Sequence, residues 1–289
     1  MTLNAGYRAL AVVDSVQGVP VPVHVLYPTS SETTAATFDR HVVEVALDGE
    51  IDGEGLGVVA ISHGNGGTPW SHRGLALHLA RAGYAVVLVE HPGNCRLDNA
   101  LAGTVANLAN RPRHLRLALD AVFADPVVGP RVEAGRAALI GHSIGGYTAL
   151  AVAGGRPSSL PHESLDGVAR PIAVEVDHRV DTVVLLAPAL PWLMAPGALA
   201  EVRPRMLVRT GECDDIAPPD FVARVLRGLP ADTPLDQRVV PGAGHFAWIH
   251  PFPPELASPA ILPSLDPAGF DRAAYQAEHY ADVLAFLRC

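Results

Sequence analysis

The chain has 289 residues, of which 49% are hydrophobic and 18% are charged, a composition that supports a large buried core. All 21 basic residues are arginine, and 30 acidic residues leave a formal net charge of −9. This balance argues against a nucleic-acid-binding surface. Because lysine is missing, the chain cannot form a lysine Schiff base, a P-loop lysine contact or a Ser-Lys dyad.

The cysteines and the N-terminal residues bear on the cellular compartment of the protein. Cys95, Cys213 and Cys289 are odd in number and widely spaced, so they fit neither a disulfide framework nor a zinc site. The first residues do not resemble a secretory signal, and we expect a cytoplasmic protein. Two long runs with almost no charge, 137–155 and 180–200, are interrupted by glycine, proline or polar residues, and the second also contains Asp181. They are interpreted as buried strand and helix segments, and no membrane span is predicted.

Short apolar segments alternate with helical patterns along the chain. Strands are predicted over 6–13, 21–27, 57–62, 85–90, 137–141, 182–187, 205–210 and 236–240. Helices are predicted over 70–82, 105–124, 144–154, 219–228 and 271–288. Strands such as VVAIS and AVVLVE lack polar alternation, as expected when both sheet faces are covered.

This alternation predicts an α/β fold, with a mostly parallel sheet of about eight strands covered by helices on both faces. No linker or repeat divides the chain, so residues 1–289 are predicted to form a single domain. The segments 155–180 and 189–204 are candidate small caps over the site. Ligands of such sheets bind at the carboxyl ends of the strands.

The most informative motif follows the fifth predicted strand. Gly141-His142-Ser143-Ile144-Gly145 is a G-x-S-x-G pentapeptide between an apolar run and an alanine-rich helical pattern. Such a sequence is typical of a nucleophile elbow, a sharp turn that exposes the serine hydroxyl at the end of a strand. The alternative is a glycine-rich turn whose serine has no chemical role. His142 is expected to pack and hydrogen-bond around the elbow.

A serine nucleophile needs a base to take its proton and an acid to orient that base. His245 follows the last predicted strand in a G-x-G-H turn, and Asp214 follows the strand before it. We predict these two residues as base and acid. His250 is the main competitor for the base, and Asp215 and then Glu212 compete for the acid.

Acyl transfer also requires backbone amides that stabilise the developing oxyanion. The amide after the nucleophile, that of Ile144, and the amide of Asn65 in the glycine-rich stretch 63–67 are predicted for this role. An ordinary strand-to-helix turn is the alternative for that stretch. Four aromatic side chains follow the catalytic loops and either wall an apolar acyl pocket or belong to the core: Trp70, Trp192, Phe246 and Trp248.

Several of these stretches resemble the α/β-hydrolase superfamily, and within it the predicted dienelactone hydrolase and platelet-activating-factor acetylhydrolase-like serine esterases. The similar stretches include AISHGNGGTPW, NLANRPRHLRLALDAVFADP, GHSIGGYTA and GHFAWIHPFPPEL. The resemblance covers most of the chain from about residue 6 and is weaker over 29–56 and 155–180. It implies a nucleophile at Ser143, an acid at Asp214 and a base at His245, with the oxyanion amides already named.

One residue departs from the family pattern. Dienelactone hydrolases have a cysteine at the elbow, whereas this chain has Ser143. The resemblance therefore implies a serine esterase that cleaves short-acyl esters or lactones through an acyl-serine intermediate, without a cofactor or metal. An acyltransferase or biosynthetic cyclase with the same triad is the first alternative, and a non-catalytic ligand-binding homologue is the second. The expected partner is a small-molecule substrate; the sequence predicts no oligomeric state.

Overall fold

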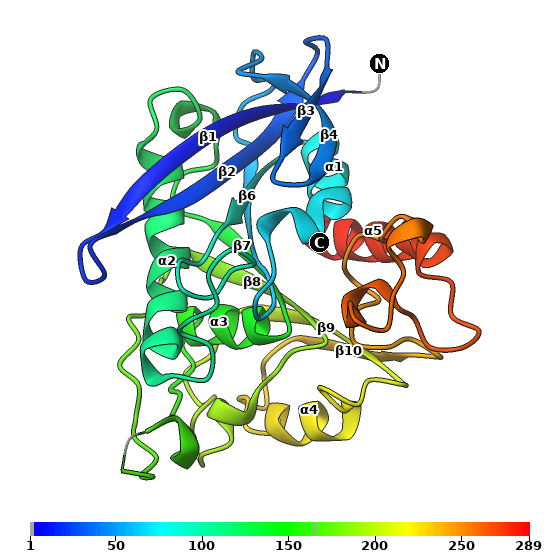
Figure 1. The fold of residues 1–289 in the computed structure, drawn as a ribbon. Helices are drawn as coiled ribbons and strands as arrows, with labels where there is room; N and C mark the ends of the chain where they lie inside the picture. The colour runs from blue at the N-terminus through cyan, green and yellow to red at the C-terminus, as the bar shows by residue number, and fades with distance from the viewer. Residues whose placement is uncertain (1–2, 165) are drawn as a thin grey trace.

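The computed structural model describes residues 3–164 and 166–289. Ten strands in this part of the chain form one sheet in the order β10-β9-β8-β7-β5-β6-β2-β1-β4-β3 (Figure 1). In chain order they are β1 (Asn4–Asp14), β2 (Val19–Thr29), β3 (Thr34–Phe38), β4 (His41–Leu47), β5 (Gly57–Ser62), β6 (Tyr84–Val89), β7 (Ala137–His142), β8 (Val180–Leu186), β9 (Arg205–Gly211) and β10 (Leu235–Val240).

The predicted fold class is confirmed. Strands β6, β5, β7, β8, β9 and β10 are parallel neighbours, and β1 and β2 extend the sheet by antiparallel pairing. All eight predicted strands are present, and β3 and β4 are two strands that the sequence analysis did not predict. The central parallel strands β5, β6 and β7 are buried on both faces, which explains their continuous apolar sequences.

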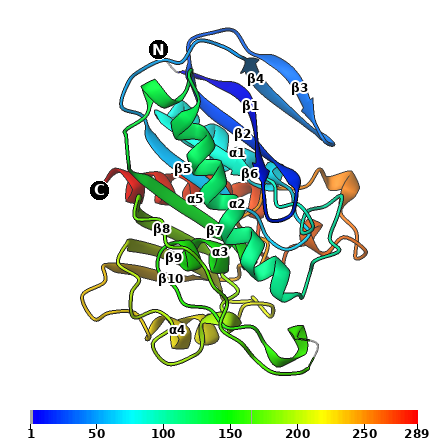
Figure 2. The same cartoon turned by 90° about the vertical axis from the view of Figure 1, so that its left-hand side faces the viewer.

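Helices cover both faces of the sheet, as Figures 1 and 2 show. The side chains of the sheet and its helices form two clusters of buried residues, one on each face. On one face lie α2 (Val105–Ala124), α3 (Ile144–Val152) and α4 (Pro219–Leu226); on the other lie α1 (Arg73–Arg81) and α5 (Arg272–Arg288). The helix predicted over 70–82 begins as a 3₁₀ turn at Pro69–His72 before it becomes α1.

Helix α2 contains a proline that ties it to α3. Pro112 has no backbone N–H, so the carbonyl of Leu108, one turn earlier, loses its usual helical partner. The Tyr147 hydroxyl of α3 donates to this carbonyl at 2.8 Å. The buried tyrosine thus satisfies the acceptor that the proline leaves open, and the two helices that flank the elbow are joined by a specific bond.

The unpredicted β3–β4 hairpin packs on aromatic side chains. Its Phe38 ring stacks on Trp70 with a centroid distance of 4.1 Å and an interplanar angle of 16°. The turn between the strands needs an unusual backbone conformation at Asp39, whose φ is 54°. Arg96 forms a bidentate ion pair with the Asp39 carboxylate and so holds the turn against the loop after β6.

The two candidate caps contact each other. Each has little regular structure beyond a short 3₁₀ turn, and the first includes residue 165, which lies outside the described residues. They are joined by backbone hydrogen bonds from Arg156 N to Ala198 O (2.8 Å) and from Ser158 N to Trp192 O (2.9 Å). Among the described residues, no helix is long and apolar enough to cross a membrane.

The strand order fixes where a site can form. From β5 the chain proceeds to β6 on one side, and β7 then pairs with β5 on the other side. The connections after β5 and β7 therefore leave the sheet in opposite directions, which opens a crevice at the carboxyl ends of these strands. The segment 63–67 and Ser143 follow these two strand ends.

Candidate active site

Ser143 lies at a sharp turn between β7 and α3. Its backbone has φ 56° and ψ −123°, a conformation that L-residues rarely adopt and that stores strain. Two bonds hold it there: Ser143 N donates to Leu186 O at 3.0 Å, and Ala189 N donates to Ser143 O at 2.9 Å. The turn therefore has the strand, strained serine and helix expected of a nucleophile elbow.

The glycines of the pentapeptide are required by close packing. A Cβ on Gly141 would lie 2.1 Å from the carbonyl oxygen of Gly145, and a Cβ on Gly145 would lie 2.0 Å from the carbonyl oxygen of Ser62. Both distances are far below van der Waals contact. The small residues let α3 approach β5 and β7 closely, which keeps the turn sharp.

Asp214 and His245 are brought together from the loops after β9 and β10. His245 Nδ1 donates to Asp214 Oδ2 at 2.9 Å and lies 3.1 Å from Oδ1. The Asp214 Oδ1 atom also accepts the backbone amides of Ile216 (2.9 Å) and Ala217 (2.8 Å). Burial alone would raise the pKa of Asp214, but the hydrogen bond from His245 and these amides outweigh burial and hold the pKa below its usual value.

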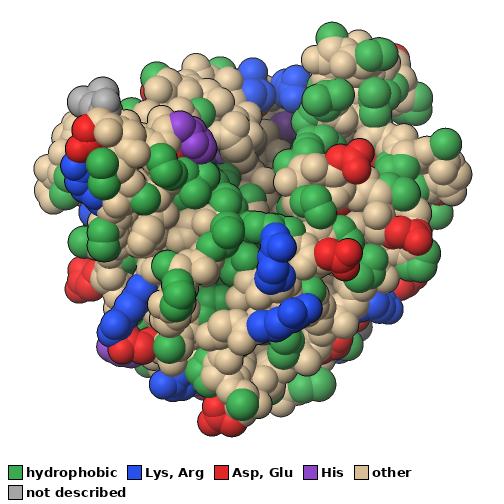
Figure 3. Space-filling view, turned by 90° about the horizontal axis from the view of Figure 1, so that it is seen from below, with side chains coloured by type: hydrophobic (Ala, Val, Ile, Leu, Met, Phe, Trp, Pro, Cys, Tyr) green, Lys and Arg blue, Asp and Glu red, His purple; other side chains and the backbone are tan. Residues whose placement is uncertain are grey.

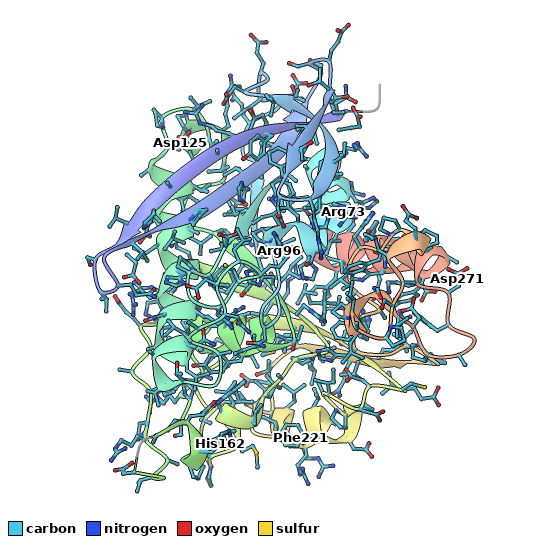
Figure 4. The ribbon with its side chains drawn as sticks, viewed as in Figure 1. Arg73, Arg96, Asp125, His162, Phe221 and Asp271 are labelled. Carbon is cyan, nitrogen blue, oxygen red and sulfur yellow. The ribbon has the colours of Figure 1, made fainter. Side chains whose placement is uncertain are left out.

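The competing residues lie elsewhere. Asp215 is exposed, and Glu212 accepts a bond from Gly242 N at 2.8 Å. His250 lines a neighbouring cavity together with Arg73, a residue labelled in Figure 4. Burial lowers the pKa of His250 to about 4. Of the three carboxylates considered for the acid, the structure therefore pairs Asp214 with His245.

His142 supports the imidazole from the other side. Its Nε2 donates to the carbonyl oxygen of His245 at 2.9 Å, and the two ring centroids are 5.1 Å apart. This agrees with the expected packing and hydrogen bonding around the elbow. In the described residues the His245 ring is bonded to Asp214 but not to the Ser143 hydroxyl. In enzymes without bound substrate such catalytic hydrogen bonds are often long, and they tighten when substrate binds.

The glycine-rich loop after β5 packs directly on the elbow. A Cβ on Gly64 would lie 3.1 Å from His142 Nδ1 and 3.4 Å from Ser143 Cβ. The next residue, Asn65, is exposed, and its Oδ1 accepts Asn94 Nδ2 at 2.7 Å. As the first residue of α3, Ile144 has a backbone amide with no partner within the helix.

A cavity of about 240 Å³ lies beside these loops. Residues 64–68 line it, together with His142, Phe246 and apolar side chains of the C-terminal segment, Ile249, Phe252 and Ile261. Arg96 also lines it, and Figure 4 labels this residue. Figure 3 shows the molecule notched on one side, with arginine and histidine side chains near the notch and hydrophobic ones around it.

Of the four aromatic residues predicted as pocket walls, Phe246 lines this cavity. Trp70 and Trp248 are 3% and 1% exposed and belong to the core that includes α1 and α5. Trp192 packs edge-on against Tyr147, and its Nε1 donates to Glu163. These three tryptophans pack in the hydrophobic core or against Tyr147, and none of them lines this cavity.

Sequence reasoning missed Arg111. Its side chain is fully buried beneath the loop after β5, where Nη2 donates to the His63 carbonyl oxygen and Nη1 donates to Asn94 Oδ1 at 2.6 Å. One signal was available: Arg111 falls on the same helical face as Leu108 and Leu115, three residues before and four after it, both buried. A charged residue on the apolar face of a helix indicates a specific partner.

Metal ions in proteins require sets of suitable donor side chains. Within residues 3–164 and 166–289, no group of three or more His, Cys, Asp or Glu side chains is arranged to hold a metal ion.

No protein-family model matches this sequence, and no curated protein sequence matches it. Solved structures do. The ferulic acid esterase from Streptomyces cinnamoneus superimposes with a TM-score of 0.71 at 19% identity, covering 99% of this chain and 89% of that one. A dienelactone hydrolase-like promiscuous phosphotriesterase from metagenomic libraries gives a TM-score of 0.60 at 16% identity, covering 98% and 99%.

The dienelactone hydrolase from Anabaena variabilis gives a TM-score of 0.54 at 21% identity, covering 83% of this chain and 88% of that one. At these identities the comparisons speak to the fold. Together with the sheet order, the helices on both faces and the elbow after β7, they show that this chain has the α/β-hydrolase fold.

Proposed function

We propose that this protein is a serine hydrolase that cleaves carboxylic esters through an acyl-Ser143 intermediate. The observation that carries the proposal is the bond from His245 to Asp214, 2.9 Å long, in loops that meet at the same sheet edge as the strained turn of Ser143. A serine in such a turn, with a histidine oriented by a buried carboxylate, is the arrangement that acyl transfer requires.

The proposed reaction has two halves. His245 Nε2 takes the proton of Ser143 Oγ as this oxygen attacks the ester carbonyl carbon, and the tetrahedral intermediate collapses to the acyl-serine. The leaving alkoxide receives the proton from His245 and departs as an alcohol. In the second half His245 takes a proton from water as the water oxygen attacks the acyl carbon. When this tetrahedral intermediate collapses, His245 returns the proton to Ser143 Oγ, so that the carboxylic acid is released and both residues are restored.

Asp214 acts through His245. Because its carboxylate stays ionised, it keeps the Nδ1 proton of the imidazole in place and leaves Nε2 free to accept the serine proton. The amides of Asn65 and Ile144 are proposed to donate to the oxyanion, a contribution of about 3 kcal/mol for each donor in related sites. The packing of Gly64 against Ser143 supports this role for the loop.

The cavity supports a small, largely apolar substrate. Phe246 and the apolar residues of the C-terminal segment wall a space of about 240 Å³, which suits a short acyl chain or a lactone ring. Two of the similar structures are named an esterase and a dienelactone hydrolase, and these names support ester or lactone hydrolysis at the same kind of site. We also infer a cytoplasmic setting, supported by the three free cysteines.

The proposal is tested with nitrophenyl esters of two to eight acyl carbons and with lactones of five- and six-membered rings. We expect the wild type to hydrolyse the short esters faster than the long ones. Ser143→Ala should lose about four or more orders of magnitude in kcat, as removal of a triad nucleophile does elsewhere. A wild type without activity on any of these substrates, or a Ser143→Ala variant that keeps it, would contradict the proposal.

A further inference from the structure

Arg111 is a buried cation without a carboxylate partner. Its side chain is 0% exposed, yet no Asp or Glu of the described residues forms an ion pair with it. Arg209 makes the contrast: it is 2% exposed and is paired with both Asp236 and Asp282. Because burying an unpaired charge is costly, the bonds that hold Arg111 in place must compensate.

Those bonds lead to both proposed oxyanion amides. On the first side, Nη2 donates to the carbonyl oxygen of His63, two residues before Asn65. Nη1 donates to Asn94 Oδ1 at 2.6 Å, and Asn94 Nδ2 in turn donates to Asn65 Oδ1 at 2.7 Å. The guanidinium thus fixes the loop that carries the Asn65 amide by two independent routes.

On the second side, the same guanidinium reaches the N-terminus of α3. Arg111 Nε donates to Thr148 Oγ1 at 3.1 Å, and the Thr148 hydroxyl donates to the carbonyl oxygen of Ile144 at 2.9 Å. The planar fork of an arginine suits this task because its donors point in fixed directions. One side chain therefore sets the two amides relative to each other.

A directional chain of hydrogen bonds leads from Arg111 to the nearest carboxylate in the network. Nη2 donates to Ser62 Oγ (3.2 Å), so the Ser62 hydroxyl donates to His91 Nε2 (2.9 Å). His91 Nδ1 then donates to His114 Nδ1 (3.4 Å), and His114 Nε2 donates to Asp14 Oδ2 (3.2 Å). Burial lowers the pKa of His91 well below its usual value and that of His114 to about 4.

Both imidazoles of the chain are therefore neutral at neutral pH. They orient Arg111 without cancelling its charge, since the negative charge stands at the far end on Asp14. Burial lowers the pKa of Arg111 to about 9, which leaves the guanidinium protonated at neutral pH. Because the guanidinium is buried and little screened by water, its fixed charge acts more strongly on a nearby developing oxyanion than an exposed charge would.

We propose that Arg111 is a positioning residue for the ester hydrolysis: its guanidinium fixes the loops that carry the Asn65 and Ile144 amides, and its uncancelled positive charge favours the oxyanion. This role rests on the proposed function. A purely structural residue would affect the neutral bound ester and the charged tetrahedral intermediate alike. The proposed role of Arg111 instead stabilises the charged tetrahedral intermediate more than the neutral ester.

The test compares Arg111→Met and Arg111→Lys with the matched control Arg209→Met, which removes an equally buried arginine whose side chain bonds to Asp236 and Asp282 and not to the loops that carry the Asn65 and Ile144 amides. Two quantities are measured: kcat and KM for nitrophenyl butyrate, and inhibition by a boronic acid that forms an anionic tetrahedral adduct with Ser143. For Arg111→Met we expect kcat to fall about 100-fold and the affinity for the boronic acid to fall by a similar factor. KM should stay within about threefold of the wild-type value. Arg111→Lys should recover about tenfold in kcat, and Arg209→Met should lose stability alone.

The outcomes separate the two proposals. A folded Arg111→Met variant with kcat and boronate affinity within threefold of wild type overturns the role of Arg111. If circular dichroism shows that this variant does not fold, Thr148→Val decides, since it removes one guanidinium bond without changing side-chain volume. A kcat loss of about fivefold or more is expected there, and a wild-type kcat overturns the role. A wild type that neither hydrolyses the ester nor binds the boronate overturns the proposed function as well.

Discussion

Adjacent carboxylates in the loop after β9 have opposite environments. Asp214 is 3% exposed, accepts two backbone amides and bonds to His245, whereas the side chain of Asp215 is in solvent. The backbone of the loop decides this difference, because Asp214 Oδ1 receives the amides two and three residues further on. Such a loop places one carboxylate inward and the next outward.

This contrast gives a matched pair of variants. In Asp214→Asn the side-chain oxygen must still accept the amides of Ile216 and Ala217, so its NH₂ group faces His245 Nδ1 and disfavours the Nδ1–H tautomer. We expect kcat for nitrophenyl butyrate to fall by about 10⁴ with little loss of structure. Asp215→Asn should keep kcat within about twofold. Equal losses in the two variants would contradict the assignment of Asp214 as the acid.

The sequence indicated Ser143, Asp214 and His245 because each follows a strand and belongs to a local motif. It could not indicate Arg111 in the same way. The partners of Arg111 lie 17, 37, 48 and 49 residues away along the chain, so only the folded sheet brings them together. Likewise, a tryptophan after a catalytic loop has the same local signature whether it enters the core, as Trp248 does, or a pocket.

At the scale of elements, the strand-turn-helix unit around Ser143 stores strain. A residue with a Cβ at φ 56° and ψ −123° costs about 1–3 kcal/mol, whereas glycine adopts this region more easily. We therefore expect Ser143→Gly to be more stable than Ser143→Ala by about 1 kcal/mol in urea unfolding, although both lose activity. An alanine variant as stable as the glycine variant would show that the turn is not strained.

A buried ion pair joins two elements that are distant in sequence, β1 and α2. Burial alone would raise the pKa of Asp14, but its bonds from Arg113 (2.9 and 2.7 Å) and from Val16 N lower the pKa to about 2. Since the unfolded value is near 4, the pair stabilises the fold fully above that pH and loses its effect as the pH falls toward 2.

Comparison of the wild type with Asp14→Asn measures this contribution. At pH 6 we expect the free energy of unfolding of the wild type to be larger than that of the variant. About 2 kcal/mol of this difference comes from the lower pKa of Asp14 in the folded than in the unfolded protein. At pH 3 about half of that pH-dependent part should remain. A difference that is the same at both pH values would mean that the pKa of Asp14 is not lowered by folding.

The β3–β4 hairpin shows why one pair of elements was missed. The hairpin ends the sheet, with β3 as the edge strand beside β4. Its residues are half-exposed, and its sequence lacks the long apolar runs of the central strands. The hairpin turn is formed by Asp39 and Arg40 without a glycine, although the turn requires a positive φ at Asp39. Edge position and an unusual turn residue removed both usual signals of a hairpin.

At the scale of the whole molecule, the two faces of the sheet share the same strands. Along β5, Val58 and Ala60 belong to the core with α2 and α3, while Val59 and Ile61 belong to the core with α1 and α5. Neither core can be lost without exposing the sheet that supports the other. We therefore propose that the chain is a single domain that unfolds as one unit.

Differential scanning calorimetry tests this proposal. We expect one thermal transition whose calorimetric and van't Hoff enthalpies agree within about 20%. Two resolved transitions, or a calorimetric enthalpy well above the van't Hoff value, would indicate that part of the chain folds separately. The segments 155–180 and 189–204, which have little regular structure, would then be the first region to compare by hydrogen exchange.

The central claim is that Ser143 is a nucleophile activated by His245, and covalent labelling tests it most directly. The protein is treated with a fluorophosphonate, and the modified residue is located by mass spectrometry. We predict one adduct, on Ser143, that forms in the wild type, is absent in Ser143→Ala and forms at least about 100-fold more slowly in His245→Ala. An unlabelled wild type, or a label on another residue that persists in Ser143→Ala, would contradict the account.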